Sequence, residues 1–272
     1  MTNWILCPLR NGLYLTKQAA KTFAAQDIGN VDVLFINNGS TDGTAEWLSS
    51  VDAARISCGN LSVAQSWNIG LRFLFGFKGA QYIDYVLVVN NDVELRPDTY
   101  RHLVEDGGFF VTGVGVDDRK AIEPGWKWVT DCNIGGKSEA PHSLWPSPDP
   151  TAKRPHPDFS CFLIDRECWD RVGPFDEHCE VAFYEDNLYH VAMHRKGIAA
   201  YCLDLPFFHH GSATIKNADP VERERIQQAA AKNKEYFHSK WKCYPGTPEY
   251  EALFSSETFG VDRCLMGDDR TR

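Results

Sequence analysis

Short apolar runs alternate with amphipathic stretches through the first third of the chain. The apolar runs predict strands at 4–9, 31–36, 53–57 and 85–89. Apolar residues at helical spacing predict helices at 13–25, 45–50 and 62–75, the last with Ser62 as its N-cap. The run at 85–89 has no polar interruption, which is typical of a parallel strand buried on both faces. Strand–helix alternation of this kind predicts an open α/β sheet that binds ligands at the carboxyl ends of its strands.

The middle of the chain breaks this pattern. Residues 117–158 contain seven prolines together with Trp126, Trp128 and Trp145, so we expect a long irregular segment there. Beyond it the pattern predicts strands at 159–164 and 199–205. It predicts helices at 166–172, from 185 to about Gly197, and from Asp219 to about Ser239, the last with Asp219 as N-cap and Pro220 in the first turn.

Composition narrows the class of protein further. The 272 residues carry 28 Lys and Arg against 37 Asp and Glu, a formal net charge of −9, and 43% of them are hydrophobic. This is ordinary globular composition, and its acidic balance disfavours a broad nucleic-acid surface. No apolar run approaches the roughly 18 residues of a membrane span, so we expect no transmembrane anchor. The N-terminus resembles a first strand more than a signal peptide.

The nine cysteines are scattered, with no CxxC pair among them, so a zinc ribbon or a thioredoxin-type site has no support. We expect reduced thiols, packed as small hydrophobic side chains in a cytoplasmic protein. The sequence also contains neither a GxGxxG motif nor a P-loop, which argues against a dehydrogenase and a P-loop kinase.

Four polar clusters stand where a ligand could bind, after predicted strands or at a predicted helix start. They are 37–44 (NNGSTDGT), 90–92 (NND), Glu185–Asp186 and His209–His210. Carboxylates bind hard cations, imidazole binds transition metals, and paired carboxylates can supply a general base. Each cluster also has an ordinary structural explanation, as a turn, a helix cap or a structural histidine. Taken singly, these clusters leave the function open.

Taken in order, the clusters resemble the family 2 glycosyltransferases, the inverting nucleotide-sugar enzymes of the GT-A fold. The segments that carry the resemblance are 37–44, 60–70, the DXD-type metal motif at 90–92, 162–166, 172–177, Glu185–Asp186, Gly197, the strand ending in histidine and the C-terminal helix end at 233–241. Together they cover about residues 3–250. The resemblance implies a GT-A-like, Rossmann-like α/β fold, with a mixed, mostly parallel central sheet flanked by helices and with a C-terminal helix and tail.

The resemblance also implies how the chain is divided. Residues 1–218 would form the catalytic domain, with a nucleotide-binding half at 1–116 and an acceptor and catalytic half at 117–218. Residues 219–272 would form a C-terminal helix and tail packed on the same domain. The tryptophans of the irregular segment could stack on sugar or base faces, and the segment could close over the bound donor.

Roles for single residues follow from the same resemblance. Asp186 resembles the catalytic base that removes the acceptor hydroxyl proton, and Glu185 would orient it or raise its pKa. Asp92 would bind a divalent cation, Mn²⁺ or Mg²⁺, together with a histidine at the end of the last strand. Both His209 and His210 fit, and the spacing slightly favours His209. The implied donor-binding residues are Pro8, Asn11, Asn37, Asn38, Ser40, Asn60, Asn68, Asn90 and Asn91.

Three positions depart from the family pattern. Asn37 replaces an Asp that reads the base, Asn90 replaces the first Asp of the DXD motif, and Leu188 replaces the second Asp of a Glu-Asp-x-Asp pattern. Because the 90–92 loop keeps one acidic ligand, we expect modest metal affinity and a preference for Mn²⁺ over Mg²⁺. A UDP-sugar is still the favoured donor.

The function we expect is therefore inverting, metal-assisted transfer of a sugar from a nucleotide-diphosphate sugar to an acceptor hydroxyl. A nucleotidyltransferase is one alternative, but it would need a basic, glycine-rich loop where the chain has CPLRNG at 7–12. A non-catalytic nucleotide- or sugar-binding module is the other; the weakened 90–92 motif favours it and the retained Glu185–Asp186 pair opposes it. The acceptor, whether a glycan, a small molecule, a protein or a modified nucleic acid, is not specified by the sequence.

Overall fold

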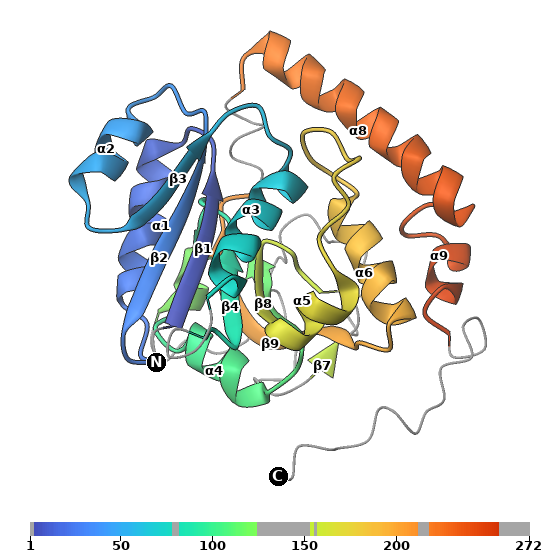
Figure 1. Ribbon diagram of the computed structural model, residues 1–272, viewed down its shortest axis with the longest axis horizontal. Coiled ribbons are helices and arrows are strands. Elements are labelled where there is room, and N and C mark those ends of the chain that lie inside the picture. Colours follow the sequence, from blue (N-terminus) through green and yellow to red (C-terminus); the bar gives the residue numbers. More distant parts are fainter. Residues whose placement is uncertain (1–2, 78–81, 124–152, 155–156, 212–217, 256–272) are drawn as a thin grey trace.

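The computed structural model describes residues 3–77, 82–123, 153–154, 157–211 and 218–255, which form one mixed sheet with helices on both faces (Figure 1). The strands are β1 (Asn3–Leu9), β2 (Val31–Asn38), β3 (Ala54–Cys58), β4 (Tyr85–Val89), β5 (Val93–Glu94), β6 (Phe110–Val116), β7 (Lys153–Arg154), β8 (Cys161–Asp165) and β9 (Ala200–His209). The helices are α1 (Leu13–Ala24), α2 (Thr44–Ser50), α3 (Val63–Phe75), α4 (Thr99–Asp106), α5 (Arg166–Val172), α6 (Glu185–Arg195), α8 (Pro220–Trp241) and α9 (Pro248–Ala252), with a 3-10 turn at Arg119–Ile122.

The strands lie in the order β3-β2-β1-β4-β8-β6-β9-β5, and β7 pairs with β9. The first four are parallel to one another, β8 is antiparallel to both of its neighbours, and β6 and β9 run parallel again. The short strands β5 and β7 run antiparallel to β9. Most of the described strands therefore share one direction, and the expected α/β fold with a mixed, mostly parallel sheet is confirmed.

The elements expected in the first 90 residues are confirmed to within two residues at each end. Local signals explain this accuracy. Ser62 caps α3 as predicted, because its hydroxyl accepts from the Gln65 amide while the Gln65 side chain accepts from the Ser62 amide. Asp219 likewise caps α8 by accepting from the Glu222 amide at 2.9 Å.

The second half of the sheet differs more from expectation. The apolar pattern did not identify β6, because Thr112, Gly113 and Gly115 interrupt its run. Gly113 is required there, since a Cβ would come within 2.6 Å of the Leu205 carbonyl oxygen of β9. Strand β9 was expected to end at 205 but continues to His209, with Pro206 accommodated at a shift in its register against β6. Most of the irregular segment at 117–158, including Trp126, Trp128 and Trp145, lies outside the described residues.

Two apolar cores cover the two faces of the sheet. On one face α3, α5 and α6 pack through a cluster that includes Trp67, Phe162 and Tyr189. On the other face α1, α2 and α4 pack through a second cluster that includes Phe23 and Tyr100. These two layers of helices cover the sheet on both faces (Figure 1).

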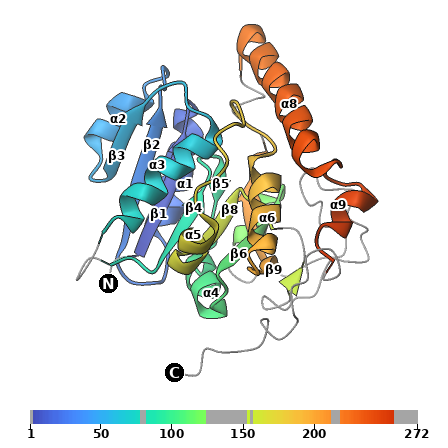
Figure 2. The same ribbon diagram turned by 45° about the vertical axis from the view of Figure 1, so that its right-hand side comes forward.

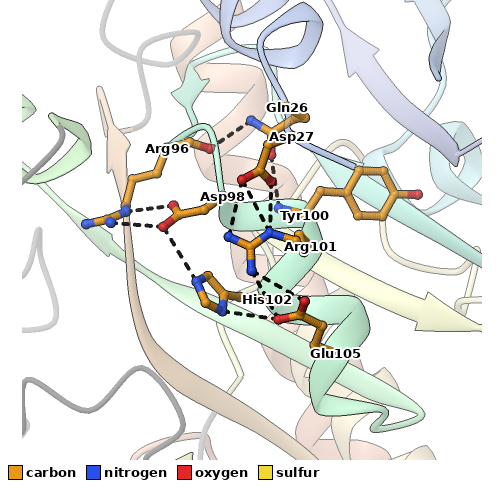
Figure 3. Close-up of polar contacts among 8 residues, drawn as sticks. All are labelled: Gln26, Asp27, Arg96, Asp98, Tyr100, Arg101, His102 and Glu105. Atoms are coloured by element: carbon orange, nitrogen blue, oxygen red, sulfur yellow. Dashed lines mark hydrogen bonds and ion pairs between the residues drawn. The ribbon is translucent and has the colours of Figure 1, made fainter. Parts of the chain in front are cut away.

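A polar network joins the residues that follow α1 to the start of α4, about 70 positions later in the sequence (Figure 3). The Gln26 side chain accepts from the Tyr100 amide at 2.9 Å and donates to the Arg96 carbonyl at 2.8 Å. Arg101 bonds to both carboxylate oxygens of Asp27. Gln26 thus caps α4 from a distant part of the chain, because the carboxylate of the N-cap residue Asp98 binds Arg96 and not the helix amides.

The long helix α8 runs beside α6 at the edge of the molecule (Figures 1 and 2). Phe237 of α8 and Tyr250 of α9 pack with Leu188 and Val191 of α6 in a third apolar cluster. Leu188, the position of the missing second Asp, is therefore a buried core residue in this chain. No helix in the described part of the chain is long and apolar enough to span a membrane.

Candidate active site

A cavity of about 360 Å³ opens at the carboxyl ends of β1, β2 and β4. Its wall also includes the start of α3, residues 157–160 and 181–186, the end of β9 and the first turns of α8. Among the residues predicted from the sequence, those that line it are Pro8, Asn38, Asn90, Asn91, Asp92, Glu185, Asp186 and His209. The tertiary structure thus brings together residues up to about 200 positions apart in the sequence, at the edge where an open α/β sheet binds ligands.

The two candidate histidines face different partners. His209 Nε2 lies 3.4 Å from Asp92 Oδ1, and both residues line the cavity. His210 Nε2 instead lies 3.0 Å from Glu94 Oε1, and His210 is not part of the cavity wall. The difference arises because neighbouring residues at a strand end point to opposite sides. The geometry therefore distinguishes two residues that the sequence left nearly equivalent.

Glu94 was not singled out by the sequence. Its carboxylate is buried and accepts from Arg119 at 2.6 Å as well as from His210. Burial alone would raise the pKa of Glu94, but the hydrogen bonds and charges of Arg119 and His210 lower it below its ordinary value. Glu94 therefore stays ionised and holds His210 away from the cavity.

Asp92 and His209 together offer one carboxylate and one imidazole, a pair of groups that can bind a divalent cation. Across the described residues, no group of three or more His, Cys, Asp and Glu side chains is placed to hold a metal ion. A cation at Asp92 and His209 would therefore take its remaining ligands from water or from a bound molecule. Diphosphate oxygens would meet that need, so the site fits a cation that binds together with a nucleotide.

Hydrogen bonds join the ends of β1, β2 and β4 and the turns that follow them, which contain most of the predicted donor-binding residues. Asn11, at φ 58°, donates from its amide to Ser40 Oγ at 2.8 Å and accepts from the Thr41 amide at 2.7 Å. Asn37 accepts from the Ser40 amide at 3.1 Å, and Asn91 donates to the Asn11 carbonyl at 3.0 Å. The cavity wall does not include Asn11, Asn37 or Ser40. These residues instead join the turns next to it.

Three other asparagines predicted to bind the donor have different surroundings. Asn38 lines the cavity, and its amide group pairs with both backbone groups of Leu61. Asn60 is exposed and has a left-handed φ of 57° in the adjoining turn. Asn68 is fully buried away from the cavity, where it exchanges hydrogen bonds with the backbone of Phe175. The structure thus gives Asn68 a structural partner and does not bring it to the cavity.

Glu185 and Asp186 begin α6, where the helix dipole favours negative charge. Glu185 is 6% exposed, and its Oε2 has no hydrogen-bond partner within the described residues. Burial, and then the charge of Asp186, raise the pKa of Glu185 well above its ordinary value. Asp186 Oδ1 accepts from the Asn187 amide at 2.7 Å. Both side chains line the cavity, and Glu185 is the one whose burial favours the protonated form.

Several residues of the cavity wall were not predicted. Asp158 is buried and accepts from the backbone amides of Gly115 and Ser160. Arg10 forms a 2.9 Å ion pair with Glu222 of α8, which joins the first loop to the C-terminal helix across the cavity. Phe183 lies in the wall just before α6. Of these three residues, only Arg10 has a sequence signal, because it stands between the candidates Pro8 and Asn11.

Comparisons with known proteins agree with this geometry. Residues 5–127, just under half of the chain, match the model of glycosyl transferase family 2. No curated protein sequence matches the chain.

Solved structures with this fold include the mannosyltransferase PcManGT from Pyrobaculum calidifontis in complex with GDP-Man and Mn²⁺. It has a TM-score of 0.57 and 16% identity, over 94% of this chain and 68% of that one. S. aureus TarS 1–349 in complex with UDP-GlcNAc has a TM-score of 0.51 and 14% identity, over 93% and 78%. Glucosyl-3-phosphoglycerate synthase from Mycobacterium tuberculosis, with Mn²⁺, UDP and phosphoglyceric acid, has a TM-score of 0.52 and 16% identity, over 85% and 76%.

The structural neighbours show that the chain has the GT-A fold, and the family match over residues 5–127 identifies a glycosyltransferase. The match of residues 5–127 to glycosyl transferase family 2 agrees with the resemblance that the motifs carried.

Proposed function

We propose that this protein transfers a sugar, with inversion at the anomeric carbon, from a nucleotide-diphosphate sugar to an acceptor hydroxyl. The observation that carries the proposal is that Asp92, His209 and the Glu185–Asp186 pair line one cavity at the carboxyl ends of the parallel strands. In this arrangement Asp92 and His209 would provide a site for a charged diphosphate, and the acidic pair would provide a carboxylate base. The structural neighbours that hold GDP-Man, UDP or UDP-GlcNAc support a nucleotide-sugar donor.

The donor would occupy the side formed by the ends of β1, β2 and β4. The predicted donor-binding residues that line the cavity are Pro8, Asn38, Asn90 and Asn91. The turns next to them are joined by the hydrogen bonds of Asn11 with Ser40 and Asn91. A UDP-sugar is our favoured donor. We assign residues 1–116 to the donor side. Residues 117–218 would supply the base and the acceptor side, and α8 would complete the wall.

Asp186 would act as the general base. As the acceptor oxygen attacks the anomeric carbon, the acceptor proton passes to the Asp186 carboxylate and the bond from that carbon to the diphosphate oxygen breaks. The nucleoside diphosphate leaves with the bonding electron pair. The buried Glu185 has a raised pKa, so it retains its proton and leaves the negative charge on Asp186.

Asp92 and His209 would hold a divalent cation, with Mn²⁺ preferred. When bound, the cation neutralises charge that develops on the departing diphosphate. The Mn²⁺ in the structures of PcManGT and of the phosphoglycerate synthase supports this assignment. The seven described cysteines are free thiols, which supports a reducing compartment such as the cytoplasm.

A donor panel tests the proposal directly. We expect one of UDP, GDP, dTDP and CDP to raise the melting temperature, with a larger rise in Mn²⁺ than in Mg²⁺ or EDTA. The protein should then hydrolyse the matching nucleotide-sugar slowly, with water as the acceptor, and release the nucleoside diphosphate. Full turnover in excess chelator would contradict the metal assignment. A flat response to every nucleotide would favour a non-catalytic module, and release of inorganic pyrophosphate from a nucleoside triphosphate would favour a nucleotidyltransferase.

A further inference from the structure

The loop that precedes α6 has an unusual backbone. Val181, Phe183 and Tyr184 have φ values of 55°, 79° and 72°, so three residues in a row of four lie in the left-handed region without a glycine among them. Such values are rare for bulky side chains and especially for a β-branched one, because the Cβ crowds the backbone. A strained segment of this kind persists only where surrounding structure holds it.

Groups outside the loop bind four consecutive carbonyls of this segment. Asn233 of α8 donates through Nδ2 to three of them, those of Glu180 at 2.8 Å, Ala182 at 3.0 Å and Phe183 at 3.1 Å. The amide of Val63, at the start of α3, donates to the remaining one, on Val181, at 2.8 Å. Asn233 Oδ1 also accepts from the Glu180 amide at 2.9 Å. The loop is thus held between α3 and α8, as its position in Figures 1 and 2 also shows.

The held segment leads directly into the candidate catalytic pair. Val181, Ala182 and Phe183 line the cavity, and Glu185 and Asp186 follow immediately. Asn233 itself is 1% exposed and is not part of the cavity wall. Its side chain therefore acts on the cavity only through the backbone that it binds.

We propose that Asn233 is a positioning residue for transfer: it holds residues 180–184, with Val181, Phe183 and Tyr184 at left-handed φ, and so aims Asp186 at the acceptor. The inference rests on the role proposed for Asp186. The requirement for asparagine is chemical, because this position uses both N–H donors of the amide and also its carbonyl oxygen. The two N–H groups of Asn233 serve three carbonyls, so one of them is shared, whereas a serine has one donor and an ionised aspartate has none.

The neighbouring residue supplies a matched control. Lys232 also contacts the loop, through an ion pair between its Nζ and the Glu180 carboxylate at 3.0 Å. Both side chains of that pair are more than half exposed, so it contributes little to order. Removing Lys232 changes the same helix and the same loop while leaving the four carbonyl contacts intact.

The experiment compares Asn233→Ala and Asn233→Asp with Lys232→Ala. The assay follows diphosphate release from UDP-glucose, UDP-GlcNAc and GDP-mannose in Mn²⁺. The concentration of competent enzyme comes from the stoichiometry of a calorimetric nucleotide titration. Because small displacements of reacting groups cost up to about 100-fold, we expect kcat to fall at least about tenfold in both Asn233 variants. The donor KM should stay within about twofold, as should both constants of Lys232→Ala.

Hydrogen exchange gives a readout that does not depend on turnover. Amides at 180–186 should exchange at least about tenfold faster in Asn233→Ala than in the wild type, with β1 and β4 unchanged. A kcat per competent molecule within twofold of the wild type, or unchanged exchange at 180–186, would overturn the proposal. Asn233→Asp keeps the side-chain volume and carries the comparison if the alanine variant does not fold. If the wild type releases no diphosphate, the proposed function fails while exchange still tests the positioning contact.

Discussion

Two edges of the same cavity contain left-handed residues other than glycine, and they achieve this conformation differently. On the donor side the residues are Asn11 and Asn60, and asparagine tolerates the left-handed region by itself. On the α6 side they include Val181 and Phe183, which do not. The donor edge can therefore form from its own residues, whereas the α6 edge needs partners elsewhere in the chain.

The hydrogen bonds follow the same division. Asn11 bonds to Ser40, Thr41 and Asn91, and Asn38 bonds to Leu61, so these hydrogen bonds of the donor turns lie within the first 91 residues. The approach to α6, residues 175–184, is bound by hydrogen bonds at both ends. Asn68 of α3 binds Phe175, and Asn233 of α8 binds Phe183. We infer that substitutions on the donor edge should mainly change nucleotide binding, and that substitutions on the α6 edge should mainly change turnover.

The largest effect should come from Asp186→Asn, which tests that separation most sharply. Loss of a general base should lower kcat by about 10²–10⁴-fold, because the acceptor proton has no carboxylate to receive it. The nucleotide dissociation constant, measured by calorimetry, should change by less than about twofold, because the base contributes to the reaction and little to ground-state binding. Asn187→Ala, on the same helical turn, is the control. If Asp186→Asn keeps a tenth or more of wild-type turnover, Asp186 is not the general base.

The two histidines offer the next comparison, on the donor edge. His209→Ala should weaken the apparent Mn²⁺ affinity by about tenfold or more, since loss of a metal contact costs at least as much as loss of an outer partner. His210→Ala should leave that affinity within about twofold, because Glu94 keeps its bonds from Arg119. Titrating Mn²⁺ into the nucleotide complex, followed by melting temperature, separates them. Equal effects of the two substitutions would show that the distinction between the histidines is wrong.

A stability measurement probes the α6 edge. Asp176, at the start of the approach to α6, accepts hydrogen bonds from Tyr236 and Lys240 of α8. Burial alone would raise the pKa of Asp176, but Lys240, His178 and Tyr236 lower it well below its ordinary value. We expect Asp176→Asn to lower the free energy of unfolding by about 1–2 kcal/mol at pH 7.

That loss should depend on pH in a defined direction. Because the folded state lowers the pKa of Asp176, the carboxylate stabilises the fold above about pH 4 and ceases to do so as pH falls through the folded-state value. The difference between wild type and Asp176→Asn in urea unfolding should therefore shrink below about pH 4. A difference that is constant from pH 7 to pH 3 would contradict this account.

A second pH-dependent effect on stability is expected at Glu185. Its raised pKa means that the folded state holds the proton more tightly than the unfolded chain, so stability falls as pH rises above about 4.5 and through the folded-state value. Glu185→Gln removes this dependence. The melting temperature of the variant should therefore rise relative to the wild type between pH 5 and pH 8, with pH 5 as the internal reference. A constant offset would indicate that Glu185 is ionised throughout.

The sequence predicted the parallel half of the fold closely because its signals are local. Apolar periodicity marked β1 to β4, and Ser62 and Asp219 carried their capping partners within three residues. Strand β6 was not predicted, because its glycines are required by the close packing of β9 and interrupt the local apolar pattern.

The candidate site divides along the same line. The amino-acid pattern by itself determined which chemical groups follow the strands and open α6, and their order was enough to indicate the family. Pairing of β5 with β9, which places Val93 opposite His209, decided which histidine meets Asp92. Packing of α8 decided that Asn233 holds the loop before α6. Contacts between residues so far apart leave no periodic trace in the sequence, because their energy arises only once the sheet and its helices have assembled.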